Sequence, residues 1–164
     1  MARALVALGS NQGDRAAHLA RALAALAALK GTAVVAAATP VETAPERPDD
    51  GGPFLNSAAL LETSLPPRAL LEHLHEVERR LGRERATPGR GARTIDLDLI
   101  LYDRVVVRGG AGFELPHPRF RSRRFVLEPA AEIAPQMIDP VTRRTVADLL
   151  RLAPRAPAAP TGSP

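Results

Sequence analysis

The run from Arg93 to Leu101 (RTIDLDLIL) alternates between polar and apolar side chains and predicts a β-strand. A strand has a side-chain period of two, so Asp96 and Asp98 project from one face, roughly 6–7 Å apart along the strand. The apolar residues of the opposite face are Ile95, Leu97, Leu99 and Leu101. The pattern therefore predicts a half-buried strand that presents two carboxylates on its polar side.

Two like charges at that separation repel each other unless a cation lies close to both. Mg²⁺ suits them, because it is typically bound by one or two carboxylates together with substrate phosphates. A solvated acidic face is the alternative, and it would be preferred for an isolated Asp-x-Asp. The basic residues before this pair favour a polyphosphate site, and they are Arg83, Arg85, Arg90 and Arg93.

The chain has 164 residues, enough for one domain with a sizeable core. Its formal net charge is +4, and nearly all of the positive charge is arginine, since Lys30 is the only lysine. Arginine forks match phosphate oxygens. The absence of cysteine excludes disulfides and thiolate catalysis. Because the sequence has neither a secretory signal nor a run long enough for a membrane span, we expect a cytoplasmic protein with no membrane partner.

Apolar periodicity and turn residues predict the order of the elements. The first half predicts a strand at Arg3–Leu8, a helix capped by Asn11 or Asp14 and ending near Leu29, a β-compatible segment at Thr32–Thr43, a loop at Ala44–Pro53, a strand at Phe54–Thr63 and a helix from Pro66 to about Leu81. The second half predicts a loop at Arg83–Ala92, the aspartate strand, a short strand at Val105–Val107, a turn at Pro116–Pro118, and helices at Phe125–Ile133 and Val146–Leu152.

Residues 1–152 are expected to form a single domain, and the Ala/Pro-rich tail at residues 153–164 is expected to be disordered. The predicted order of strand, helix, strand, strand, helix and strand is typical of an α+β ferredoxin-like sandwich. In such a sandwich we expect helices on one face of an antiparallel sheet.

Several motifs, taken in order, resemble one enzyme family. They are Gly9-Ser10-Asn11, Thr43-Ala44-Pro45, Phe54-Leu55-Asn56, the run from Gly91 to Asp98 and the block from Leu115 to Leu127 (LPHPRFRSRRFVL). Together they look like the 6-hydroxymethyl-7,8-dihydropterin pyrophosphokinases of the folate pathway, and the match covers nearly the whole chain up to the tail. The resemblance implies transfer of the β,γ-diphosphate of ATP to the hydroxymethyl oxygen of the pterin, with release of AMP.

The resemblance also implies roles for single residues. Asp96 and Asp98 would hold two Mg²⁺ ions, with ATP as the co-substrate, and Arg83 and Arg93 would be catalytic arginines that neutralise the moving phosphate charge. The implied nucleotide contacts are His75, Glu78, Arg85, Leu99, His117 and Arg123. The alternatives are a solvated helix face for His75 and Glu78, which lie three residues apart, and a weak surface ion pair for Arg93.

A flat heteroaromatic pterin needs two apolar faces and an edge of hydrogen bonds. The implied pterin contacts are Thr43, Ala44, Pro45, Phe54, Asn56 and Phe125. The two phenylalanines match family positions that enclose the ring, and core packing is the alternative for both. Asn56 offers a donor and an acceptor to the ring edge.

The chain departs from the family pattern in its second loop, where Arg90-Gly91-Ala92-Arg93 stands in place of Trp-Gly-Pro-Arg. Ala86 replaces a lysine of some members, and Arg124 stands where a small residue is common. None of these differences involves the aspartate pair.

Two other functions fit parts of the sequence. Nucleotidyltransferases also combine Gly-Ser with Asp-x-Asp, but there the two motifs lie close in sequence, whereas Ser10 and Asp96 are most of a domain apart. Ferredoxin-like sheets can bind RNA by stacking bases on aromatic residues. Here the key strand carries aspartates, which repel a phosphate backbone. We therefore expect small-molecule substrates, ATP and the pterin, and no nucleic-acid partner.

Overall fold

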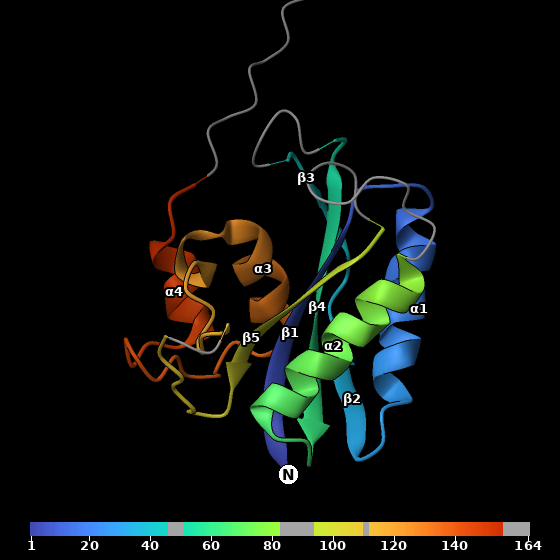
Figure 1. Cartoon of the computed structure of the whole chain (residues 1–164). Coiled ribbons are helices and arrows are strands. Elements are labelled where there is room, and N and C mark those ends of the chain that lie inside the picture. The colour runs from blue at the N-terminus through green and yellow to red at the C-terminus, as the bar shows by residue number, and fades with distance from the viewer. Residues whose placement is uncertain (46–50, 83–93, 110–111, 156–164) are drawn as a thin grey trace, which may run out of the picture.

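An antiparallel sheet of five strands organises the part of the chain that the computed structural model describes, residues 1–45, 51–82, 94–109 and 112–155. The strands are β1 (Ala2–Ser10), β2 (Thr32–Ala37), β3 (Val41–Thr43), β4 (Phe54–Thr63) and β5 (Asp96–Tyr102). Their spatial order is β2-β4-β1-β5, and β3 pairs with the end of β4 that β2 does not reach. This order, with β1 between β4 and β5, confirms the α+β ferredoxin-like class (Figure 1).

Helices cover both faces of the sheet (Figure 1). On one face lie α1 (Arg15–Ala27) and α2 (Pro67–Leu81), and on the other lies α3 (Arg124–Ile133), with α4 (Val146–Leu152) packed against it. Each helix in the described residues falls short of the length and apolarity that crossing a bilayer requires.

The prediction of helices on one face is therefore wrong, and the composition of β1 explains why. Val6 and Leu8 lie in the core under α1 and α2, whereas Leu5 and Ala7 lie in the core under α3. A central strand that is apolar on both sides needs a helical layer on each side.

Most predicted elements are confirmed within a residue or two. The bounds of β4 and α4 are as predicted, and α2 begins at Pro67 and ends at Leu81. Asp14 caps α1 by accepting a hydrogen bond from the Ala17 N–H (3.1 Å), as one of the two candidate caps. The segment from Thr32 to Thr43 divides into β2 and β3. A short 3₁₀ turn, η2 (Phe120–Ser122), precedes α3 and was not predicted.

The predicted strand at Val105–Val107 is wrong. The chain turns sharply at Asp103, which has a φ of 44°, and the Val105 N–H donates to the Tyr102 carbonyl (2.9 Å). In the described part of this loop, Val107 makes an isolated antiparallel bridge with Leu115. Val105 and Val107 pack against the core under α1 and α2 without joining the sheet, and Val106 is exposed, so their apolar character did not signal a strand.

A β-bulge in β5 alters the predicted alternation. Leu5 of β1 pairs with Leu101, but the next residue, Val6, pairs with Leu99, so Ile100 is an extra residue. Leu99 lies in the core under α1 and α2 as predicted, whereas Leu101 lies in the core under α3. The alternation therefore holds for the aspartate half of the strand and is wrong for Leu101.

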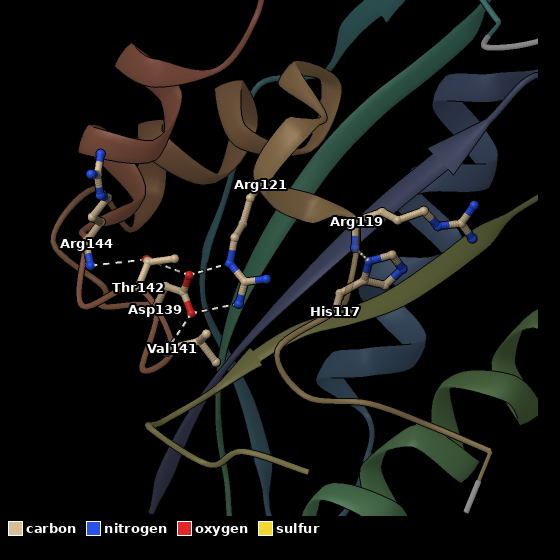
Figure 2. Close-up of polar contacts among 7 residues, drawn as sticks. All are labelled: His117, Arg119, Arg121, Asp139, Val141, Thr142 and Arg144. Atoms are coloured by element: carbon tan, nitrogen blue, oxygen red, sulfur yellow. Dashed lines mark hydrogen bonds and ion pairs between the residues drawn. The ribbon is translucent and has the colours of Figure 1, made fainter. Parts of the chain in front are cut away.

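Asp139 holds a tight turn between α3 and α4. The side chain is fully buried, and the Asp139 N–H donates to the Arg144 carbonyl across the turn (2.9 Å). The carboxylate accepts hydrogen bonds from the Val141 N–H (3.0 Å), from the Thr142 hydroxyl (2.7 Å) and from two nitrogens of Arg121 (Figure 2). Because Arg121 belongs to η2, the ion pair joins this turn to the segment before α3.

Burial alone would raise the pKa of the Asp139 carboxyl. The hydrogen bonds from Arg121, Thr142 and Val141, together with the charge of Arg121, outweigh burial, so the pKa is lowered from 3.8. A folded-state pKa below the unfolded value means that the ionised group stabilises the fold above the unfolded pKa. That stabilisation is lost as pH falls through the folded value.

We predict that Asp139→Asn lowers the free energy of unfolding by about 2 kcal/mol at neutral pH, because it removes a buried charge-assisted pair. The difference from wild type should stay constant above about pH 5 and shrink as the solution becomes more acidic. Urea unfolding at a series of pH values measures it. A difference that grows on acidification would contradict the assignment.

Candidate functional site

The sheet register gathers residues of four strands on one face. Gly9 of β1 pairs with Asn56 of β4 on one side and with Asp96 of β5 on the other. Two residues before Asn56, at the start of β4, Phe54 pairs with Thr43 of β3. Because side chains alternate along a strand, these residues share the face that holds Leu5 and Ala7 under α3. That face therefore changes from apolar to polar along its length.

These side chains form one side of a pocket of about 780 Å³, called here the main pocket. The segment from His117 to Val126 and the helix α2 supply its other sides. The predicted site residues that line it are Thr43, Ala44, Phe54, Asn56, His75, Glu78, Asp96, Asp98, His117, Arg123 and Phe125. The fold thus brings together most of the predicted site from distant parts of the sequence.

Other predicted site residues are not part of this lining. Leu99 lines a smaller neighbouring pocket. Pro45 is described but is not among the residues that line the main pocket. Arg83, Arg85 and Arg93 lie outside the described residues.

Several lining residues had no role assigned from the sequence, among them Gly9, Arg119 and Ser122. Gly9 is the most constrained, because a Cβ atom there would lie 3.2 Å from Asn56 Oδ1 and 3.6 Å from the Phe54 ring. A glycine inside a strand often marks such a close approach, so the position of Gly9 in the first strand could have indicated its role. Arg119 and Ser122 gave no comparable signal.

Asn56 is held in a fixed orientation beside the aromatic side chain of Phe54. The residue is 5% exposed, and its Nδ2 donates to the Thr43 hydroxyl of the neighbouring strand. On the far side of the pocket, Phe125 is the second residue of α3, and the Arg123 guanidinium lies 5.4 Å from the centre of its ring. The pocket therefore combines two aromatic rings with an anchored amide, which suits a flat polar ligand.

His117 is held in one orientation at the wall of the pocket. Its backbone N–H donates to the Ile100 carbonyl (3.0 Å), and its Nδ1 accepts from the Arg119 N–H (3.2 Å; Figure 2). Burial lowers the pKa of His117, and Arg123 and Arg119 lower it further, while Asp98 acts in the opposite direction. The neutral imidazole then carries its proton on Nε2, which is able to donate to an anionic ligand.

Glu78 has a structural role that the sequence did not indicate. Its Oε2 accepts a hydrogen bond from the Leu97 N–H (3.0 Å), which lies between the two aspartates of β5. The alternative of a solvated helix face is therefore wrong for Glu78. Through this contact α2 fixes the edge strand that carries the carboxylates.

The donor set of the main pocket suits a hard divalent cation with further oxygen ligands. The described residues contain no cluster of three or more His, Cys, Asp or Glu side chains that could hold a metal ion. Asp96 and Asp98 offer two carboxylates. A cation bound to them would take its other oxygen ligands from a bound ligand or from water. His117, Arg119 and Arg123 line the same pocket and favour an anionic ligand.

A second pocket of about 410 Å³ adjoins the first. His75, Asp98 and His117 line both pockets, so the two lie side by side. The further lining residues of the second pocket are Leu71, Leu99, Gly109, Gly112, Phe113, Glu114 and Pro118. Its more apolar wall suits a second group of the same ligand or a second ligand.

Comparisons with known proteins agree on one family. The family model of 7,8-dihydro-6-hydroxymethylpterin-pyrophosphokinase (HPPK) matches residues 5–135. The chain is 44% identical over 138 residues to the 2-amino-4-hydroxy-6-hydroxymethyldihydropteridine pyrophosphokinase of Methylorubrum extorquens, covering 84% of this chain and 86% of that relative. The enzyme of the same description from Bacillus subtilis is 41% identical over 134 residues, covering 82% of this chain and 79% of that relative.

Among solved structures, wild-type HPPK-DHPS of Plasmodium falciparum matches with a TM-score of 0.72 at 12% sequence identity. The match covers 92% of this chain but 44% of that one, so this chain spans less than half the length of that structure. At this identity the likeness shows a shared fold.

We predict that the pKa of His117 in metal-free buffer lies below its ordinary value of 6.5. Asp98→Asn should lower it further, because the aspartate favours the imidazolium, and Arg123→Gln should raise it. A titration of the His117 ring protons by NMR measures each value. A pKa that responds to neither substitution would contradict the arrangement.

Proposed function

The chain belongs to the 7,8-dihydro-6-hydroxymethylpterin-pyrophosphokinase family, and we propose that its main pocket is where the family's reaction takes place. The enzyme transfers the diphosphate of ATP to the hydroxymethyl group of 6-hydroxymethyl-7,8-dihydropterin in folate biosynthesis, and AMP is released. One observation carries the assignment of the site. The register of β1 with β4 and β5 brings the amide of Asn56 and the carboxylates of Asp96 and Asp98 to one pocket.

The pterin would bind between Phe54 and Phe125. The Asn56 amide, oriented by Thr43, supports this proposal, because it offers a donor and an acceptor to the amide and amino edge of the ring. The backbone at Ala44 and Pro45 would contact the same edge. Gly9 leaves the space that the ring needs beside Asn56.

ATP would extend from the main pocket into the second pocket. His117 and Arg123 would contact the phosphates, and His75 and Leu99 would contact the nucleoside portion, with Glu78 beside them. The three lining residues that the two pockets share, His75, Asp98 and His117, support this path. Arg85, which lies outside the described residues, is the remaining proposed contact to the nucleotide.

Asp96 and Asp98 would hold two Mg²⁺ ions. When bound, these ions would supply positive charge that neutralises the phosphates of ATP. The two carboxylates fit this role because they share one face of a rigid strand and line the pocket beside three basic side chains. Asp98 also borders the second pocket, and Asp96 does not.

For this reaction the protein mainly has to position the two substrates and neutralise the charge of the phosphates. The hydroxymethyl oxygen bonds to the β-phosphorus of ATP, the bond from that phosphorus to the α,β-bridging oxygen breaks, and the hydroxyl proton passes to solvent. His117 would donate its Nε2–H to a phosphate oxygen. Arg83 and Arg93 would neutralise the charge that develops on the leaving AMP and on the moving diphosphate.

The proposed setting is the cytoplasm, with ATP and the pterin as partners and with no membrane or nucleic acid involved. The aspartates on the pocket face of β5 support the last point, since they repel a nucleic-acid backbone. A nucleotidyltransferase would instead release pyrophosphate, so the products distinguish the two reactions.

We predict that the protein with ATP, Mg²⁺ and 6-hydroxymethyl-7,8-dihydropterin forms AMP, and forms it only when the pterin is present. Asp98→Asn should reduce the rate by about 100-fold or more, because it removes one of the two carboxylates that would hold the Mg²⁺ ions. Separation of the nucleotides by anion-exchange chromatography measures both effects. Glu76→Gln, which removes a carboxylate on the exposed surface of α2, is the matched control and should keep the wild-type rate. Release of ADP or pyrophosphate would refute the assigned reaction.

We also predict that Gly9→Ala raises the KM for the pterin by about tenfold and leaves the KM for ATP nearly unchanged. The added Cβ would crowd Asn56 Oδ1 on the pterin side of the pocket. Initial rates with each substrate varied in turn measure the two constants. Gly52→Ala, where a Cβ meets nothing within 4 Å, is the control. Equal rises in both constants would contradict the assigned pterin position.

A further inference from the structure

Four arginines between positions 119 and 124 are directed to two different places. Arg119 and Arg123 line the main pocket. Arg121 and Arg124 instead bond to the segment from Pro135 to Ala153, called here the C-terminal clamp. Figure 2 shows the Arg121 side chain directed to Asp139, and the Arg119 side chain directed the other way, past His117.

We propose that the C-terminal clamp positions the pocket segment, residues 117–125, for catalysis, with Asp139 acting through Arg121 as the main positioning residue. This rests on the proposed function of the main pocket. Neither Asp139 nor Arg121 lines that pocket, so neither would touch the substrates.

The pocket segment has limited internal support. Two of the three backbone hydrogen bonds around η2, from Phe120 N–H to the His117 carbonyl and from Ser122 N–H to the Arg119 carbonyl, are long, at 3.5 and 3.4 Å, and the third, from Arg123 N–H to the Phe120 carbonyl, is 3.1 Å. A short 3₁₀ turn with such bonds depends on outside contacts for its conformation. One contact is Phe120, which is completely buried under α3.

The Arg121–Asp139 pair is the second outside contact, and it has the features of a rigid one. Two guanidinium nitrogens of Arg121 bond to the two carboxylate oxygens, which fixes direction as well as distance. Val141 and Thr142 donate to the same carboxylate, so Asp139 is itself held by its own turn. The carboxylate is fully buried, which strengthens its hydrogen bonds relative to a surface pair.

Arg124 supplies the third contact, on the other side of η2. Its Nη1 donates to the Leu150 carbonyl (3.2 Å) and to the Ala153 carbonyl (3.4 Å) at the end of α4, and its Nε donates to Glu128 (3.2 Å). The last carbonyls of a helix lack partners within the helix and attract a cation. The clamp therefore holds the pocket segment both within η2 and at the first residue of α3.

Charge gives this arrangement a functional consequence. Arginines so close in sequence repel one another, and the clamp binds two of them through a carboxylate and helix-end carbonyls. Arg119 and Arg123 are thereby directed into the pocket, with Phe125 next to them. The aspartates on β5 are held mainly by the sheet register and by Glu78, and the pocket segment bonds to β5 at Ile100, through the His117 N–H. Loss of the clamp should therefore disturb the basic and aromatic wall and leave the carboxylate wall in place.

The test compares Asp139→Asn, Arg121→Lys and the control Asp148→Asn. The control removes the carboxylate of another Asp–Arg pair of the clamp, the exposed pair with Arg151, which does not contact the pocket segment. Kinetics are measured well below each variant's unfolding midpoint, where its circular dichroism matches wild type. We expect Asp139→Asn and Arg121→Lys to lower kcat/KM by about tenfold or more, since small displacements of positioning groups are costly, and Asp148→Asn to leave it unchanged. The kcat/KM of the double variant should be no lower than that of the less active single variant, because both changes break the same contact.

A readout that does not depend on turnover accompanies the kinetics. In the backbone NMR spectrum of Asp139→Asn, we expect shifts at His117, Arg119 and Phe125 and none at Asp96 or Asp98. Absence of wild-type turnover would refute the proposed function, while this pattern of shifts would still support the clamp. Wild-type kcat and KM values in folded Asp139→Asn or Arg121→Lys would overturn the clamp, as would equal losses in Asp148→Asn. If Asp139→Asn fails to fold, Arg121→Lys and Arg124→Gln decide the matter, and wild-type kinetics in both would overturn the clamp.

Discussion

The pairing of β1 with β4 on one side and β5 on the other is the constraint on which the rest of the structure depends. It assigns each residue of β1 to one of two faces, and both faces are apolar enough to require a helical layer. On the α3 face the apolar side chains end near Ala7, and Gly9 follows, flanked by Asn56 and Asp96. The same register that builds the core therefore also builds the main pocket.

The two sides of the main pocket differ in how they are held. The carboxylates of Asp96 and Asp98 lie on a strand fixed by backbone hydrogen bonds. The basic and aromatic residues lie on a short segment whose position depends on side-chain contacts, above all Arg121 with Asp139. The carboxylate side is therefore fixed by the sheet itself, whereas the basic and aromatic side depends on tertiary contacts outside the sheet.

Local sequence patterns predicted the bounds of elements and the faces on which side chains lie, because neighbouring residues determine both. The bounds of β4 follow from its apolar run, and the shared face of Asp96 and Asp98 follows from the period of a strand. The bulge at Ile100 could not be predicted, because it depends on how β5 aligns with β1. Asp139 carried no signal either, since its partner Arg121 lies 18 residues away, and a buried ion pair requires a tertiary contact that no periodicity reveals. The implied pocket residues came from the family resemblance, and the described ones are mostly gathered in one place.

The hydrogen bond from the Leu97 N–H to Glu78 has a consequence for association between molecules. Among the described residues, β5 is the last strand of the sheet on its side, and an unpaired strand edge can recruit a strand from another chain. At Leu97 the outward amide is already occupied by a side chain from α2, so an incoming strand would have to displace a carboxylate and accept its negative charge nearby. The residue that fixes the edge strand beside the pocket thus also discourages this end of the sheet from polymerising.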